Sequence, residues 1–207
     1  MDTLLLLLSL ALVHLLAVAS PGPSFVLVAQ TAVGSGRRAG LLASFAMMLG
    51  AGAWAAAALF GLQALFARFE WLYLVMRIGG AAYLLYLAVM LWRHARDPLP
   101  EVKPATAGTG DWQGFTRALL LQISNPKVMV FFGSIFLALL PANPSGWMQG
   151  TTLAIVAFNE FTWYALITLL FSGGPARAFY RRAKFWLDWV MGGALALLGL
   201  RLALSDR

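Results

Sequence analysis

Residues 15–29 read LLAVASPGPSFVLVA, an apolar run that is interrupted by Ser20-Pro21-Gly22-Pro23. A second apolar run, ALLLQISNPKVMVFF at residues 118–132, is interrupted by Ser124-Asn125-Pro126-Lys127. Proline inside a helix removes a backbone N–H and frees a carbonyl on the preceding turn. In lipid the freed groups need partners, so such breaks persist only where they face protein or a wet cavity. The two stretches therefore predict two discontinuous helices around a polar interior.

The composition places these runs in a membrane. Of the 207 residues, 61% are hydrophobic and only 11% are charged, whereas a soluble domain has about 45–50% apolar and about 25% charged residues. The apolar runs are continuous rather than alternating, which predicts an all-α integral membrane protein rather than a β-barrel. The absence of Cys from the sequence excludes disulfides, thiolate metal sites and thiol–disulfide relays. We attribute the net charge of +7 to basic cytoplasmic loops and expect no nucleic-acid partner.

Each half of the chain repeats one pattern of three apolar stretches. A proline break lies in the first stretch of each half and a Gly-Gly pair in the third, Gly79-Gly80 and Gly192-Gly193. An odd number of spans per repeat inverts the second copy, so we expect one domain of six transmembrane helices. It would consist of two inverted three-helix repeats with broken helices 1 and 4, the pattern typical of secondary transporters. The six stretches are residues 4–33, 41–66, 71–92, 115–140, 148–171 and 185–204.

The expected repeat boundaries follow from these stretches. Repeat one covers residues 1–96, a cytoplasmic loop covers 94–112, and repeat two covers 113–207, all to within a few residues. Two alternatives remain at this point. The alternative to a repeat is two unrelated helix trios that share Gly-Gly by chance. The alternative to six spans is that the first stretch lies in the membrane interface, which leaves five spans.

Basic residues are distributed unequally between the loops. About ten Lys and Arg residues lie in the first, third and fifth loops, against two on the other side. The positive-inside rule then places both termini of this multi-pass protein outside the cytoplasm. Ala17-Val18-Ala19 resembles a signal-peptide cleavage site, but no positive charge precedes the apolar run. We therefore expect the first helix to be retained.

Four ionisable residues lie well inside the expected spans, where a charge is costly and is either functional or paired. They are His14, Arg77, Lys127 and Glu160. Glu160 is interpreted either as a structural partner of Lys127 or as a carboxylate that takes up protons or binds a substrate ammonium. His14 is a candidate for a proton path, with an ordinary hydrogen-bonded helix contact as the alternative. Asp188, near the end of the sixth stretch, is expected to stay solvated.

The two breaks also predict a binding site. A half-helix that starts near Ser24 directs N–H groups and the positive end of its dipole at the first break, and Asn125-Pro126 does the same at the second. Two such ends form a site for an anionic group such as a carboxylate; the alternative is a pair of structural kinks. No cofactor or metal is expected. The predicted substrate-binding or coupling residues are Ser20, Pro21, Gly22, Pro23, Ser24, Asn125, Pro126, Lys127 and Glu160.

The order of these motifs resembles the LysE/RhtB family of bacterial amino-acid exporters over nearly the whole chain. Ser20-Pro21-Gly22-Pro23 is similar to the family's Pro-Gly-Pro motif, and Asn125-Pro126-Lys127 to its Asn-Pro-Lys motif. The resemblance extends to the basic turn Gly36–Gly40, to the third-helix pattern Gly79–Leu84 and to Glu160-Phe161-Thr162-Trp163. In the last motif Asp is commoner than Glu at the first position.

The resemblance implies a transporter of the bacterial inner membrane that exports amino acids or close derivatives, driven by the proton motive force. Its partners would be the amino acid, protons and the bilayer, together with a second copy of the chain if the small-residue surfaces form a homodimer rather than internal contacts. A divalent-metal or other small-solute transporter is the main alternative. It would require several His or carboxylate ligands within the spans. We expect no enzymatic activity, because no nucleophile–base set is visible.

Overall fold

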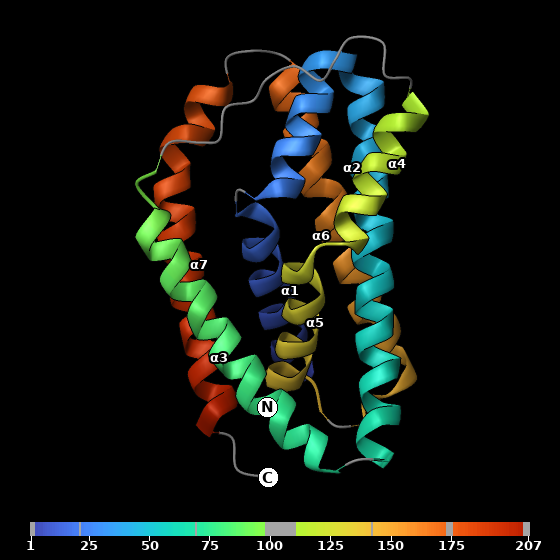
Figure 1. Cartoon of the computed structure of the whole chain (residues 1–207), viewed down its shortest axis with the longest axis vertical. Coiled ribbons are helices and arrows are strands. Elements are labelled where there is room, and N and C mark those ends of the chain that lie inside the picture. Colours follow the sequence, from blue (N-terminus) through green and yellow to red (C-terminus); the bar gives the residue numbers. More distant parts are fainter. Residues whose placement is uncertain are drawn as a thin grey trace.

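The computed structural model describes residues 3–20, 22–68, 70–97, 111–141, 143–172 and 176–204. Throughout these ranges the chain is helical, with short connections and no strand, which confirms the all-α prediction. Pro21 and most of the expected cytoplasmic loop lie outside the described residues. The helices are α1 (Thr3–Ala19), α2 (Pro23–Arg68), α3 (Glu70–His94), α4 (Asp111–Ile123), α5 (Pro126–Leu139), α6 (Gly146–Ser172) and α7 (Ala176–Leu204) (Figure 1).

The long helix α2 reverses its direction at Gly36. Gly36 has φ 85° and ψ −179°, a conformation that glycine adopts easily because it has no Cβ. A Cβ built on Gly40 would lie 3.1 Å from the Cβ of Ala32, although eight residues of straight helix would span about 12 Å. The segments before and after Gly36 therefore pack side by side, as the blue and cyan parts of α2 show in Figure 1.

By length and composition, four helical stretches can each cross a membrane: Pro23–Gly61, Leu74–His94, Gly146–Ser172 and Lys184–Leu204. The bent pair α4 and α5 makes a fifth if it is counted as one span. The sequence predicted six. The difference arises at the N-terminus, because α1 alone is short and α2 contains both the end of the first expected stretch and all of the second.

Both expected breaks are present as interruptions between consecutive helices. Between α4 and α5 the helix axis bends by 52°. Asn125 is the N-cap of α5, and its side chain accepts a hydrogen bond from the Lys127 N–H at 3.0 Å. Between α1 and α2 the helix resumes at Pro23, with the Val26 N–H donating to the Gly22 carbonyl at 3.0 Å. Proline suits the first helical position because an N–H there would have no partner within the helix.

Two apolar clusters lie on either side of the breaks. One contains buried residues of α1, α3, α5 and α7 with residues 51–59 of α2 and the first half of α6, and the other contains residues 25–47 of α2 with α4 and the second half of α6. The most extensive helix contacts are those of α2 with α6 and α4, and of α3 with α7. The polar residues of the breaks are thus held between two packed halves.

The contact of α3 with α7 depends on Gly192. A Cβ added at Gly192 would lie 2.7 Å from Cδ1 of Trp92, whose indole N–H donates to the Trp189 carbonyl at 3.2 Å. At the adjacent Gly193, nothing lies within 4 Å of an added Cβ.

We therefore expect Gly192→Ala to destabilise the protein by about 1–3 kcal/mol, the usual cost of overpacking. Gly193→Ala is the matched control and is expected to be neutral or stabilising by up to about 1 kcal/mol, because alanine favours helix. Thermal unfolding in detergent measures both variants. Equal unfolding temperatures for the two would contradict the packing described for Gly192.

Candidate functional site

The two helix breaks meet at a small cavity of about 50 Å³. Side chains from α1, the start of α2, α4, α5 and α6 surround it. Of the residues that the sequence singled out, the cavity is lined by His14, Ser20, Gly22, Pro23, Ser24, Asn125, Lys127 and Glu160. Pro126 begins α5 but does not line the cavity, and Pro21 lies outside the described residues. Residues 146 positions apart in the sequence are thus brought together, while their roles in binding stay predictions.

A chain of polar contacts crosses this cavity from α2 to α6. The Ser24 hydroxyl donates to Oε1 of Gln122 at 2.8 Å, and Nε2 of Gln122 lies 3.5 Å from Oε1 of Glu160. Glu160 is 4% exposed and Gln122 1%. An amide that is hydrogen-bonded on one side and directed at the carboxylate on the other connects the first break to the acid.

His14 approaches the same carboxylate from α1. Its Nε2 lies 3.7 Å from Oε1 of Glu160, and its Nδ1 lies 3.3 Å from Nδ2 of Asn159. The Asn159 amide also donates to the Ala11 carbonyl at 2.9 Å. The imidazole packs against Phe132, with ring centroids 5.4 Å apart. His14 is therefore both a packed helix contact and a neighbour of the acid.

One oxygen of Glu160 remains without a hydrogen-bond partner. Oε2 is buried and makes no hydrogen bond within the described part of the chain. A buried polar atom without a partner costs about 1–3 kcal/mol, so a proton or a ligand cation at this oxygen would be favourable. Lys127 and Glu160 form no ion pair within 4.0 Å of each other, although their charges interact across the cavity.

The second break differs from the expectation in one respect. The Lys127 N–H is already bound to the Asn125 side chain, and the Val128 N–H donates to the Asn125 carbonyl at 3.1 Å. The start of α5 therefore offers its dipole and the Lys127 ammonium to an anion, rather than unpaired N–H groups. The Asn-Pro pair explains this result, because a capping Asn satisfies the N–H groups that the helix itself leaves unpaired.

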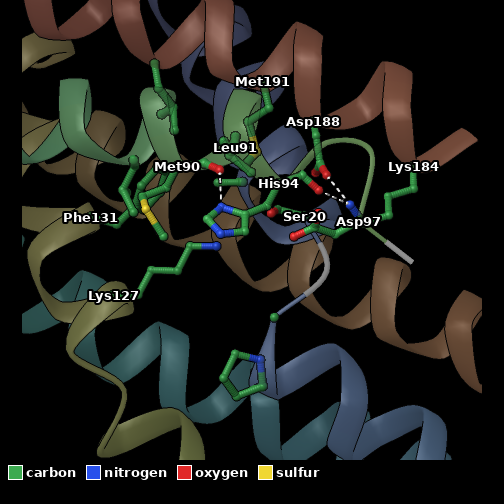
Figure 2. Close-up of a pocket in the computed structure, with 15 residues that line it drawn as sticks. Ser20, Met90, Leu91, His94, Asp97, Lys127, Phe131, Lys184, Asp188 and Met191 are labelled. Atoms are coloured by element: carbon green, nitrogen blue, oxygen red, sulfur yellow. Dashed lines mark hydrogen bonds and ion pairs between the residues drawn. The ribbon is translucent and has the colours of Figure 1, made fainter. Parts of the chain in front are cut away.

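A larger cavity of about 360 Å³ adjoins the first. The two share lining residues at the first break and on α5: Ala17, Ser20, Gly22, Pro23, Lys127 and Phe131. Its remaining walls come from the end of α3 with the turn that follows it, and from the middle of α7. In Figure 2 the Lys127 side chain extends into this space toward His94.

Asp188 lies buried at this cavity, so the prediction that it stays solvated is wrong. Its Oδ2 accepts a hydrogen bond from the Lys184 ammonium at 2.8 Å, and the two side chains are only 3% and 7% exposed. Lys184 also donates to the His94 carbonyl at 2.7 Å, so the pair ties α7 to the end of α3 (Figure 2). The position of Asp188 near the end of a hydrophobic stretch suggested that solvent could reach it, but the packing of α3 against α7 excludes solvent from the side chain.

Removing one member of this pair should destabilise the protein. We expect Lys184→Met to lower the free energy of unfolding by about 3–5 kcal/mol, because it leaves a buried carboxylate without its counter-ion. The double variant Lys184→Met with Asp188→Leu should recover most of that loss. Thermal unfolding in detergent provides the measurement. If the single variant unfolded at the wild-type temperature, the pair would not support this end of the bundle.

Sequence reasoning missed Gln122 and Asn159. Both are amides inside hydrophobic stretches: Gln122 lies two residues before the second break, and Asn159 lies one residue before Glu160. A polar side chain at such depth is itself a signal, since it requires a partner in lipid. Because both side chains are neutral, charge within the spans did not indicate them. No group of three or more His, Cys, Asp or Glu residues suited to a metal occurs in the part of the chain that the structure describes.

Membrane-length apolar helices that enclose a polar cavity at two helix breaks are typical of a membrane transport protein. The comparison with known families gives the particular group. The chain belongs to the LysE type translocator family, whose model matches residues 15–206. This confirms the resemblance inferred from the motifs, and it identifies a transporter rather than an enzyme.

Relatives match this chain over almost its full length. It is 30% identical to the threonine efflux protein of Escherichia coli K12 and 29% identical to that of Salmonella typhi, each covering 98% of this chain and 99% of the relative. It is 31% identical to the uncharacterized membrane protein YahN of Escherichia coli K12, covering 88% of this chain and 82% of the relative. No solved structure matches the chain significantly.

Proposed function

We propose that this protein exports amino acids or close derivatives from the cytoplasm across the bacterial inner membrane, driven by the proton motive force. The observation that carries the proposal is the cavity where both helix breaks, Lys127 and Glu160 come together. Full-length relatives named threonine efflux proteins support the substrate class and the direction of transport.

A free amino acid carries a carboxylate and an ammonium on one carbon. The backbone N–H of Lys127 binds the Asn125 side chain, but the Lys127 ammonium forms no hydrogen bond or ion pair with another described residue. The ammonium lies beside the dipole end of α5. It is suited to the substrate carboxylate. Oε2 of Glu160 is buried and unpartnered, and is suited to the substrate ammonium or to a proton. The two groups line the same cavity.

Competition between proton and ammonium at Glu160 provides the coupling. When the carboxylate is charged it binds the ammonium, and when it is protonated it releases the ammonium. His14, whose Nε2 is 3.7 Å from Glu160 Oε1, is positioned to exchange the proton. Glu160 would bind substrate on the cytoplasmic side and a proton on the other side. Substrate would then leave the cytoplasm as protons enter it.

Six membrane crossings in two inverted repeats underlie the transport cycle in this proposal. Three features support them. α1 and the first part of α2 follow each other around the first break, as α4 and α5 do around the second, and α2 reverses at Gly36. In Figure 1, α1 begins and α7 ends at the same end of the molecule. Alternating access would move one repeat against the other around the two breaks.

The basic end of the molecule faces the cytoplasm in this proposal, with both termini outside. Contacts place the Gly36 turn, the start of α4 and the end of α6 together: Arg38 Nε lies 3.0 Å from Asp111 Oδ2, and Arg37 donates to Ser172 at 3.2 Å. The positive-inside rule orients this end inward. A homodimer stays a prediction.

The proposal is tested with purified protein in proteoliposomes that are loaded with labelled amino acids. We expect saturable efflux that depends on a pH gradient and is abolished by a protonophore. Absence of efflux for every amino acid, with saturable transport of a divalent cation instead, would overturn the proposal in favour of the metal-transporter alternative.

A further inference from the structure

The larger cavity differs from the smaller one in its volume and in the side chains that line it. Its volume is about 360 Å³, within the range of small-molecule sites. At about 30 Å³ per molecule it would hold about a dozen waters. Its wall is formed mainly by apolar side chains of α3, α5 and α7: Leu87, Met90, Leu91, Phe131, Met191 and Leu195.

The two cavities differ in what they can hold. The smaller one, about 50 Å³, has room for one or two waters, which is enough for a substrate ammonium beside Glu160. The rest of a substrate whose ammonium lies beside Glu160 has no space there. Lys127 and Phe131 line both cavities, so a side chain leaving the polar site enters the larger one.

We propose that the larger cavity receives the substrate side chain, and that the preferred substrates are amino acids with large apolar side chains, of the size of leucine or methionine. This inference rests on the proposed export function and adds the substrate class. An apolar side chain in this space replaces water against apolar walls, which is favourable in proportion to the area covered.

The Lys184–Asp188 pair also lines this cavity, away from Met90 and Phe131. Oδ2 of Asp188 is bound to Lys184, whose ammonium also holds the end of α3, while Oδ1 of Asp188 is buried and makes no hydrogen bond with the described residues. In Figure 2, Met90, Phe131 and Lys127 lie on one side of the cavity, and the Lys184–Asp188 pair lies on the other. A hydroxyl on a short side chain next to Lys127 would therefore face thioether and aromatic carbon and lose its hydrogen bonds to water.

Efflux of leucine, methionine, alanine and threonine from proteoliposomes tests the inference. We expect leucine and methionine to be preferred over alanine and threonine by about tenfold or more in kcat/KM, the discrimination available to an apolar pocket. Met90→Trp, which fills the cavity, should reduce the leucine-to-alanine ratio about tenfold. Met90→Gln, similar in size but polar, should also reduce it. Val89→Trp is the matched control, because Val89 is 48% exposed on the outer face of the same helix, and should keep the wild-type ratio.

The possible failures are distinguishable. If no amino acid left the proteoliposomes, the export function would be wrong and this inference would fall with it. If amino acids were exported but alanine and threonine moved as efficiently as leucine, the export function would stand and the substrate class would be wrong. The class would also be wrong if Met90→Trp and Val89→Trp gave the same ratio while both were folded and inserted.

Discussion

Replacing Glu160 by Gln should lower proton-driven amino-acid efflux by about 100-fold or more, and should remove the pH dependence of the efflux that remains. The substitution keeps the shape of the side chain and the contact with Gln122, 3.5 Å from Oε1, but the amide neither gains nor loses a proton. Loss of one positioned proton-transfer group typically costs 10²–10⁴-fold. Initial efflux rates measured over a range of external pH values give both quantities.

Two controls separate this effect from general damage. Glu160→Asp retains an acid, the commoner residue at this position of the family motif, and should retain pH-dependent efflux at a reduced rate. Asp111→Asn makes the same chemical change at an exposed ion pair with Arg38, where such pairs contribute about 0–1 kcal/mol, and should leave efflux unchanged. Normal efflux with wild-type pH dependence in Glu160→Gln would exclude Glu160 from the coupling.

Replacing Lys127 by Met should raise KM for efflux by about 10- to 100-fold. A hydrogen bond to a charged group contributes about 1.5–3 kcal/mol, and methionine preserves most of the apolar stem while removing the ammonium. The effect should fall mainly on KM rather than kcat, because the ammonium binds the substrate carboxylate before transport. Concentration-dependent efflux from loaded proteoliposomes separates the two constants.

Lys127→Arg is the matched control for charge. It should recover much of the affinity, because guanidinium also binds carboxylate, although with a different geometry. An amino-acid amide, which lacks the carboxylate charge, should be transported equally by the wild type and Lys127→Met. An unchanged KM for the free amino acid in Lys127→Met would show that the carboxylate lies elsewhere.

The sequence was sufficient to predict the helical class, the two breaks and the residues that surround them. Continuous apolar runs and the prolines within them are local features of the sequence. Because a helix break exposed to lipid is costly, such prolines indicate breaks that face protein or a wet cavity. Intramembrane depth likewise singled out Lys127 and Glu160. These predictions required no knowledge of how the helices pack.

The rest depended on tertiary packing. The sequence placed a turn between the first two apolar stretches, and the chain reverses there at Gly36; the narrow form of this turn, one non-helical residue between two helical segments, is a backbone conformation that hydrophobicity does not indicate. The partners of Glu160 could not be assigned, because Gln122 and His14 reach it from other helices. Asp188 is buried only because α3 covers it, and Asn125 satisfies the N–H groups that were expected to bind an anion.

The central claim is that substrate binds where the two helix breaks meet, and thiol labelling at Ser20 tests it most directly. The chain has no Cys, so Ser20→Cys introduces a single thiol into the lining of both cavities. Ser145→Cys, at an exposed position before α6, is the control. The rate of reaction with a small methanethiosulfonate reagent is measured with and without a saturating amino acid that the variant transports. We predict that substrate slows labelling of Ser20→Cys about tenfold or more and leaves Ser145→Cys unchanged. Equal rates for Ser20→Cys with and without substrate, in a variant that still exports it, would contradict the proposed site.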